Sequence, residues 1–342
     1  MAYAGILEDV RKAVRLEKPH RLPVFACSEE FDVRMAGEIY NVYNRDAKVM
    51  AKCQVDSIRK YGYDWAWLQV DDCIEFEVLG VGVKGEGNIL PATYKYLPAT
   101  EETLRGLKMP DPEKDGRMPV LLEAIRRIKD ELGDTVCITG RVAAPFSSVT
   151  LLYGMTETAM LMYDNPGLLQ ETNKFFIELQ TMWGIAQIRA GTDALWIGDC
   201  NASGHLISVD QYREFALDGA RAITDAYREA GGLSMYHASE HMIPHMEAQI
   251  ETGVDVLSCG PGVDIADVKD AVGNKVCIVG NIDPILCLLE KDADAVYNEA
   301  KRVAETGARG GGYLFCSGEM IPRDVPEENI LAMVRGARDA MF

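Results

Sequence analysis

The chain has 342 residues, of which 48% are hydrophobic, so it is long and apolar enough to bury a large core. Its formal net charge of -18 opposes binding to the phosphates of nucleic acids and to anionic membrane surfaces. We therefore expect neither nucleic acid nor a membrane among its partners.

The N-terminal residues and the cysteines indicate a cytoplasmic protein. Residues 1–18 are typical of an amphipathic helix rather than of a secretion signal, and no apolar run is long enough to span a membrane. The nine cysteines are an odd number, and several lie inside apolar runs. We expect reduced thiols that fill the core or bind a metal, without disulfides.

Eight short apolar runs recur along the chain, most of them followed by an amphipathic stretch. Such runs are typical of parallel strands buried on both faces, and the amphipathic stretches, such as 118–133 and 292–308, predict covering helices. Eight alternating units predict an α/β fold, a (β/α)8 TIM barrel, in a single domain over residues 1–342. A doubly wound open sheet is the alternative, but no G-x-G-x-x-G follows a strand. The predicted strands lie at 21–26, 64–70, 135–142, 194–200, 232–239, 254–260, 275–283 and 311–318.

Residues 73–100 interrupt this rhythm. The segment is rich in glycine and in alternating β-branched residues. It predicts a hairpin-like insertion after the second strand, near the mouth of the barrel.

Polar residues stand at the carboxyl ends of the predicted strands, where TIM barrels carry their chemistry. They are Asp71, Asp72, Arg141, Asp199, Cys200, His237, Ser239, Cys259, Asn281, Asp283, Cys316 and Glu319.

His237, at the end of the fifth predicted strand, is the centre of a candidate metal site. A lone histidine there would more often be a hydrogen-bonded core residue. However, Asp199, Cys200, Cys316 and Glu319 should reach the same rim. Imidazole combined with carboxylate or thiolate from separate strands is a common set of ligands for a divalent metal, so the pattern favours metal binding.

His241 and His245 follow at intervals of four, on one face of a helix predicted to start near Glu240. The H-E-x-x-H order of metalloproteases is absent, so we interpret them as part of a solvated helix face. Pro244 falls in the first turn, where proline is tolerated, and Glu240 is expected to face the helix dipole.

Asp199 has two interpretations that the sequence leaves open. It is either the N-cap of the short turn that follows its strand or a functional carboxylate.

Several stretches, among them "DALWIGDCNASGHLIS", "VDVLSCGPGVDI" and "VGNIDP", stand out in the sequence. Together they resemble the uroporphyrinogen decarboxylase superfamily, and within it the zinc- and corrinoid-dependent methyltransferases. The resemblance covers essentially the full chain and implies an eight-stranded α/β barrel. The decarboxylases carry an arginine-rich segment just after "PV", which holds substrate carboxylates. Here that segment, "FACSEEFDVRMAGEIY", has the single arginine Arg34, so porphyrinogen decarboxylation is not expected. The matching stretches are "RLPV", "DALWIGDCNASGHLIS", "VDVLSCGPGVDI", "VGNIDP" and "GGYLFCSGEMIPRDVPEENI".

The resemblance also implies a set of zinc ligands. The coenzyme M methyltransferases of this family bind zinc through a His-x-Cys pair on the fifth strand and a later cysteine. His237 falls on the histidine, whereas Ser239 replaces the first cysteine. Matching "PEEN" without a gap places Glu319 at the late position, and Cys316 takes it only if a loop is inserted. We predict His237 and Glu319 as ligands, with Cys316 or Cys200 as the candidate third.

Zinc with fewer thiolate ligands is a stronger Lewis acid and suits the activation of an ether oxygen. Related members of the superfamily demethylate methoxylated aromatic compounds and deliver the methyl group to cob(I)alamin on a separate corrinoid protein. The resemblance therefore implies a methyltransferase of the O-demethylase type, with zinc and a partner-borne cobalamin as cofactors and a small-molecule methyl donor as substrate. A methylcobamide:thiol (coenzyme M) methyltransferase and a metal-free decarboxylase are the alternatives, and formation of a homodimer is left open.

Within this hypothesis His237 and Asp199 are the catalytic candidates, Asp199 by orienting a metal-bound oxygen or a ligand. The aromatic side chains of Tyr236, Trp67 and Phe146 are the candidates for packing against the substrate. Ordinary packing in the core is the other interpretation of these three rings.

Overall fold

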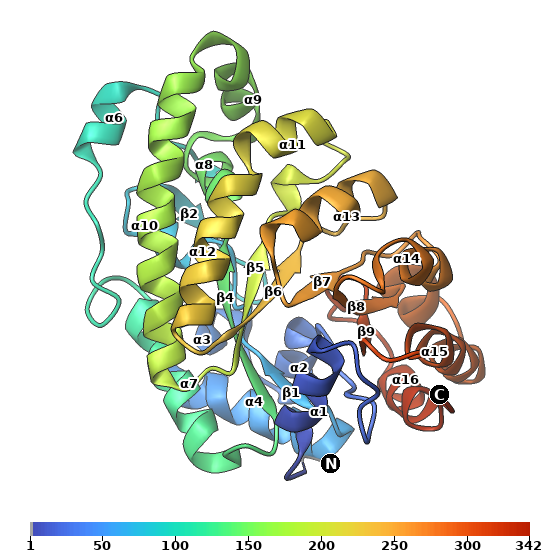
Figure 1. Cartoon of the computed structure of the whole chain (residues 1–342). Helices are drawn as coiled ribbons and strands as arrows, with labels where there is room; N and C mark the ends of the chain where they lie inside the picture. Colours follow the sequence, from blue (N-terminus) through green and yellow to red (C-terminus); the bar gives the residue numbers. More distant parts are fainter. Residues whose placement is uncertain (1–2) are drawn as a thin grey trace.

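The computed structural model describes residues 3–342 as an α/β fold with one seven-stranded parallel sheet, curved like half a barrel (Figure 1). The strand order is β1-β4-β5-β6-β7-β8-β9, so each strand of this sheet lies beside the next one along the chain. The strands are β1 (Trp65–Trp67), β4 (Cys137–Ala143), β5 (Ala194–Gly198), β6 (Leu233–His237), β7 (Val256–Ser258), β8 (Cys277–Ile282) and β9 (Tyr313–Ser317).

Six of the seven strands fall inside predicted apolar runs, and β4 extends one residue beyond its run, to Ala143. Every residue of β4, β8 and β9 is buried, as expected for strands covered on both faces. The parallel register places Arg141 beside Trp196 and Gly198 beside His237. The carboxyl ends of these strands therefore meet at one edge of the sheet.

Helices connect the strands and cover the outer face of the sheet. In Figure 1, α7, α10 and α12 flank β4, β5 and β6. Within residues 3–342, no helix combines the length and the apolar character needed to cross a membrane. The α-helices are α1 (Ile6–Val14), α2 (Glu29–Met35), α3 (Tyr40–Tyr43), α4 (Ala47–Tyr61), α5 (Ile74–Glu77), α6 (Glu101–Gly106), α7 (Met118–Leu132), α8 (Pro145–Tyr153), α9 (Met155–Asp164), α10 (Pro166–Ala190), α11 (Val209–Phe215), α12 (Leu217–Glu229), α13 (Ile243–Gln249), α14 (Ile265–Val272), α15 (Ala293–Gly307) and α16 (Glu327–Arg338).

The two amphipathic stretches singled out in the sequence are helices, α7 and α15. The N-terminal helix, α1, is shorter than residues 1–18, and the first two of those residues lie outside the described part of the chain.

Residues 73–100 contain α5 and an antiparallel pair of strands, β2 (Gly82–Lys84) and β3 (Ala92–Lys95). This pair forms a sheet of its own, apart from the seven parallel strands. The hairpin is present as predicted, and its status as an insertion stays a prediction.

The first predicted run, 21–26, is not a regular strand, but its backbone lies between the two edges of the sheet. Val24 forms an isolated parallel bridge with Phe315 of β9, and the Phe25 amide donates to the Phe315 carbonyl at 2.8 Å. On the other side, the Asp64 amide donates to the Val24 carbonyl at 2.9 Å. The segment is thus hydrogen-bonded both to β9 and to the residue that precedes β1.

Asp64 fixes this arrangement with its side chain. The carboxylate is buried, accepts the Val24 amide at 2.8 Å, and pairs with the guanidinium groups of Arg21 and Arg338. Arg338, at the end of α16, also donates to the Leu22 carbonyl at 2.9 Å. One carboxylate therefore joins the N-terminal segment, the start of β1 and the C-terminal helix.

Aromatic rings fill the interior behind the carboxyl edge. Phe25 stacks on Trp65 with ring centroids 4.4 Å apart, and Trp67 packs edge-on against Trp196 at 5.9 Å. The Trp196 ring in turn lies 4.8 Å from the imidazole of His237. This column of rings runs from the core to the end of β6.

Asp64→Asn should destabilise the fold strongly, because it leaves two guanidinium groups around a neutral side chain. We expect the free energy of unfolding in urea to fall by about 3–5 kcal/mol. The matched control is Asp56→Asn, which breaks the exposed pair with Lys52 and should change it by less than about 0.5 kcal/mol. Equal effects of the two variants would contradict the role given to Asp64.

Asp32 predicts a pH dependence of stability. Burial raises its pKa to about 8, and Ser28 donates to it at 2.7 Å. The unfolded carboxyl titrates near pH ~3.9, so between about pH 4 and 8 the folded state holds a proton that the unfolded state has lost. Its contribution to stability therefore falls as the pH rises through that window.

Asp32→Asn should remove this loss. Urea unfolding at pH 5 and at pH 8 should show a variant that gains stability over the parent chain as the pH rises. Parallel pH profiles for the two proteins would contradict the prediction.

Candidate functional site

A cavity of about 280 Å³ opens at the carboxyl edge of the sheet. Its deep walls are buried side chains, whereas Cys200 and Asp72 stand at the exposed rim. The lining residues are Trp67, Gln69, Asp72, Arg141, Ala143, Ser147, Leu151, Trp196, Gly198, Cys200, Asn201, His237, Glu319 and Met320.

His237 ends β6 and is held on two sides. Its Nδ1 lies 2.9 Å from the hydroxyl of Ser258, at the end of β7, and its ring packs against Trp196. The other nitrogen, Nε2, lies 3.3 Å from Oε2 of Glu319. The imidazole therefore presents Nε2 to the carboxylate at the cavity wall.

Glu319 follows β9 and brings its carboxylate to the same point. Ser239 donates a short hydrogen bond to Oε2, and the Met320 amide donates to Oε1 at 2.9 Å. Burial alone would raise the pKa of Glu319, but the neighbouring His237 outweighs it and lowers the pKa to about 2. For His237 burial lowers the pKa, yet Glu319 and Cys200 raise it well above its ordinary value.

Of the two candidate thiols, only Cys200 lies at this cavity. Its sulfur is 3.7 Å from the hydroxyl of Ser239, which itself lies 3.3 Å from Nε2 of His237. Cys316 is fully buried, with its sulfur 3.6 Å from that of Cys27, and does not line the cavity. Cys316 lies inside β9, below the edge of the sheet, whereas Glu319 follows the strand and reaches the rim.

His237, Glu319 and Cys200 place an imidazole, a carboxylate and a thiol on one wall of the cavity. All three groups are types of ligand that zinc accepts. Within residues 3–342, no three His, Cys, Asp or Glu side chains stand close enough together to form a ready ligand set. His237 and Glu319 are already adjacent, whereas the sulfur of Cys200 lies 3.7 Å from the hydroxyl of Ser239.

Asp199 lies behind the wall rather than in it. The carboxylate is buried, accepts from the hydroxyl of Ser147 at 2.6 Å and from the hydroxyl of Tyr236, and makes no side-chain cap of the turn that follows. Its backbone amide donates to the carbonyl of His237 at 2.7 Å. Burial raises the pKa of Asp199 to about 6. Asp199 thus stands at the N-cap position of that turn without capping it through its side chain, and its carboxylate is placed to hold its neighbours in position.

The three aromatic residues predicted to pack against the substrate differ in whether they line the cavity. Trp67 lines the cavity, whereas Tyr236 and Phe146 are buried and do not. The Tyr236 hydroxyl is occupied by Asp199 and by Tyr212, whose hydroxyl lies 3.1 Å away. The geometry therefore does not favour contact of Tyr236 or Phe146 with a substrate.

Sequence reasoning missed Trp196 as a wall of the cavity and left Arg141 without a role. Both are inward-facing and are register partners on β4 and β5. The signal was available, because Trp196 lies two residues before Gly198, the partner of His237.

The histidines after β6 differ from the prediction. The helix α13 starts at Ile243, so His241 precedes it, and His245 is buried with Nε2 2.9 Å from the carbonyl of Ile207. Glu240 is also buried and before the helix, where its carboxylate accepts the amides of His241 and Gly204. The prediction that His245 lies on a solvated helix face is therefore wrong. A metal-binding role for His245 is equally unsupported.

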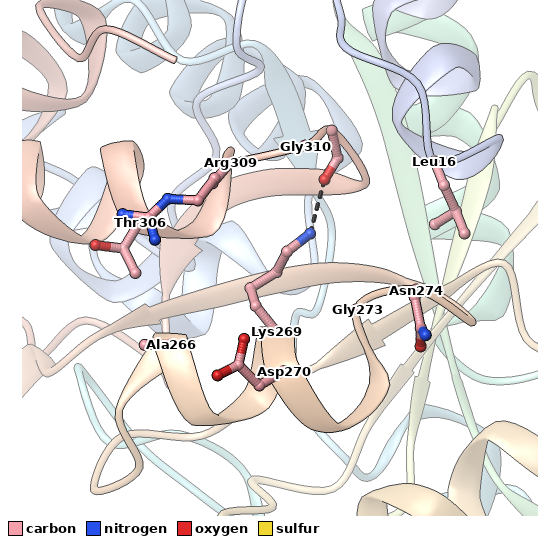
Figure 2. Close-up of a pocket in the computed structure, with 10 residues that line it drawn as sticks. Leu16, Ala266, Lys269, Asp270, Gly273, Asn274, Thr306, Arg309 and Gly310 are labelled. Carbon is pink, nitrogen blue, oxygen red and sulfur yellow. Dashed lines mark hydrogen bonds between the residues drawn. The ribbon is translucent and has the colours of Figure 1, made fainter.

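A larger cavity, of about 490 Å³, lies at the opposite edge of the sheet (Figure 2). It is lined by residues that precede β8 and β9, among them Asn274, Gly310 and Gly311. The Lys269 ammonium points across it and donates to the Gly311 carbonyl at 2.7 Å. In α/β barrels the amino-terminal edge serves stability rather than chemistry, so we do not assign the active site here.

Comparison with known proteins shows the family. The profile of the uroporphyrinogen decarboxylase (URO-D) family matches residues 7–340. The chain belongs to this family. A uroporphyrinogen decarboxylase of Actinobacillus pleuropneumoniae serotype 5b is 26% identical over 299 residues, which cover 83% of this chain and 81% of that one.

Two further relatives align over nearly the whole length. A methylcobamide:CoM methyltransferase, MtbA, of Methanosarcina acetivorans is 26% identical over 342 residues, covering 98% of both chains. The solved structure of a methyltransferase from Methanosarcina mazei superposes with a TM-score of 0.89 at 21% identity, again over 98% of both chains. The resemblance predicted from the sequence is confirmed: the match to MtbA supports the methyltransferase branch of the superfamily, and the solved structure shows the shared fold.

Proposed function

We propose that the protein is the substrate-specific methyltransferase of a corrinoid-dependent O-demethylase, which takes a methyl group from a methoxylated aromatic compound. The observation that carries the proposal is the approach of His237 Nε2 to Glu319 at 3.3 Å, on the wall of a cavity at the carboxyl edge of the sheet. Its support is the end-to-end similarity to a methylcobamide:CoM methyltransferase.

His237 and Glu319 would hold a zinc ion, with Cys200 as the third ligand. Cys316, the other candidate, faces Cys27 in the core and is disfavoured. When bound, zinc supplies Lewis acidity that draws electron density from the ether oxygen of the substrate. The ligand set proposed here has one thiolate, with Ser239 at the position of a cysteine in the coenzyme M enzymes. It leaves more positive charge on the metal than two thiolates would.

The remaining residues of the site orient His237 and bind the substrate. Ser258 and Trp196 fix the plane of the His237 ring, and Asp199 ties β5 to β6 through the amide that donates to the His237 carbonyl. Trp67 and Trp196 form the walls against which an aromatic ring would pack. Both side chains are almost fully buried, so the deep part of the cavity has apolar walls.

The proposal also includes closure of the parallel sheet into a complete barrel. The segment around Val24 bridges β9 and the start of β1, and as an eighth strand it would close the sheet into a (β/α)8 barrel of one domain. A corrinoid protein would then dock over the carboxyl edge, since the acceptor has to reach the methyl group in the cavity.

Methyl transfer to a thiol such as coenzyme M is the second candidate, and the name of the relative MtbA favours it. A metal-free decarboxylase is the third, because relatives named uroporphyrinogen decarboxylase match as well. Against the third stands Arg34, the single arginine of the segment 25–40, whose guanidinium is bound to the carbonyl of Val325 at 2.7 Å.

Zinc affinity tests the ligand set, measured by competition with a chelating dye. We expect His237→Ala and Glu319→Gln each to weaken binding by about 100-fold, since each removes one of three protein ligands. Cys200→Ser should also weaken it, whereas Cys316→Ser should not. His205→Ala, which removes an exposed imidazole, is the control. A larger effect of Cys316→Ser than of Cys200→Ser would reverse the assignment of the third ligand.

Methyl transfer tests the function. The zinc-loaded chain is mixed with a reduced corrinoid protein and a panel of methoxyarenes, methylamines and methylated thiols, and the visible spectrum of the corrinoid reports methylation. We expect a response to methoxyarenes that Glu319→Gln abolishes. Demethylation of the methylated corrinoid by a free thiol would favour the second candidate, and no response in either direction would exclude methyl transfer.

A further inference from the structure

The wall of the cavity contributed by β4 carries a buried cation, Arg141. Its side chain is 1% exposed and lines the cavity. One guanidinium nitrogen, Nη1, donates to the buried carboxylate of Glu75 at 2.5 Å, and Nη2 donates to Asp72 at the longer distance of 3.3 Å. Its Nε has no hydrogen-bond partner among residues 3–342.

A second donor of the same cavity is also without a partner. The indole Nε1 of Trp67 is buried and forms no hydrogen bond within the described chain. Trp67 and Arg141 lie on neighbouring strands, with Trp67 paired to Thr139, two residues before Arg141 on the same face of β4. Buried N–H groups almost always find an acceptor, so two orphaned donors on one wall indicate an acceptor from outside the chain.

Asp72 is the group that such an acceptor would replace. Its side chain is 62% exposed, at the rim of the cavity, and is also held by Gln69 at 2.8 Å. When Asp72 turns into solvent, Arg141 Nη2 loses an acceptor that an incoming anion can replace, whereas Glu75 is fully buried and stays to balance the charge of Arg141. The hydrogen bond from Nη1 to Glu75 is thus a permanent part of the fold, whereas the one from Nη2 to Asp72 can be exchanged for a bond to a ligand.

We propose that Arg141 and Trp67 form an anion anchor that binds the negatively charged oxygen group of the small-molecule substrate, the carboxylate of a methoxybenzoate. This inference rests on the proposed function, because it specifies the class of methyl donor. The ring of such a substrate would pack against Trp67 and Trp196, which are in edge-on contact with each other at an angle of 81°. A cavity of about 280 Å³ suits one substituted benzene ring, since sites for small molecules start near ~300 Å³.

A cationic substrate fits this wall less well. The carboxylates of Asp72 and Glu319 and the two indole rings would attract a cation, but they share the cavity with the guanidinium of Arg141. A cation would also leave both orphaned N–H donors unsatisfied.

The test is calorimetric titration of the zinc-loaded full chain, which does not depend on turnover. The probes are 3- and 4-methoxybenzoate, methoxybenzene as the uncharged analogue, and 2-mercaptoethanesulfonate as an anion carried by a thiol. We expect a methoxybenzoate to bind at least about tenfold more tightly than methoxybenzene, as charge-assisted hydrogen bonds require.

Three variants locate the anchor. Trp67→Phe keeps a ring but removes the N–H, and should weaken methoxybenzoate about tenfold more than it weakens methoxybenzene, which loses only packing. Asp72→Asn removes the competing carboxylate and should tighten methoxybenzoate about threefold or more, unlike the charge-matched control Asp56→Asn. Arg141→Lys, which keeps a cation beside Glu75, should weaken it about tenfold with an unchanged thermal unfolding temperature.

The outcomes separate the anchor from the function. Equal affinities for methoxybenzoate and methoxybenzene, unaffected by Trp67→Phe and Asp72→Asn, would overturn the anchor even if methyl transfer is observed. Binding of 2-mercaptoethanesulfonate alone, weakened by Trp67→Phe, would support the anchor, assign it to a thiol substrate and reject the O-demethylase.

Discussion

The parallel register of the sheet is the constraint on which the site depends. Because neighbouring strands run in the same direction, their carboxyl ends meet at one edge, and residues far apart in sequence become neighbours there. His237 and Glu319 are separated by 82 residues, yet they stand 3.3 Å apart. The same register sets Arg141 beside Trp196 and so builds the opposite wall of the cavity. The hydrogen bonds of the N-terminal segment to both edges, secured by Asp64, hold this arrangement together.

Much of the fold and part of the site could be predicted from the sequence. Buried parallel strands leave continuous apolar runs, so the seven strands were all located, and glycine with alternating β-branched residues marked the hairpin β2–β3. His237 and Glu319 were found because one ends a predicted strand and the other matches a family position without a gap. The segment 21–26 was also located, although its pairing is limited to one bridge and a few hydrogen bonds.

The remaining site residues depend on side-chain direction, which the sequence specifies weakly. Cys200 ends one predicted apolar run and Cys316 lies inside another, but only the structure shows that the sulfur of Cys316 meets Cys27 and that of Cys200 approaches Ser239. Tyr236 faces away from the cavity because strand residues alternate, and its neighbour on the opposite face is His237. The first turn of α13 was placed too early because Glu240, whose carboxylate accepts backbone amides, resembles a helix start in sequence. Local pattern alone does not distinguish these cases.

The restraint of the His237 ring has a consequence for the affinity of Nε2 for a metal ion. An imidazole wedged against Trp196 and tied at Nδ1 to Ser258 has already lost its rotational freedom when the chain folds. If the serine oxygen accepts the Nδ1 proton, that proton stays in place, and an incoming cation has to displace only the proton that Nε2 holds beside Glu319. Capture of a metal by this nitrogen would then require almost no reorganisation, so the entropic penalty of ordering the ligand belongs to folding rather than to binding.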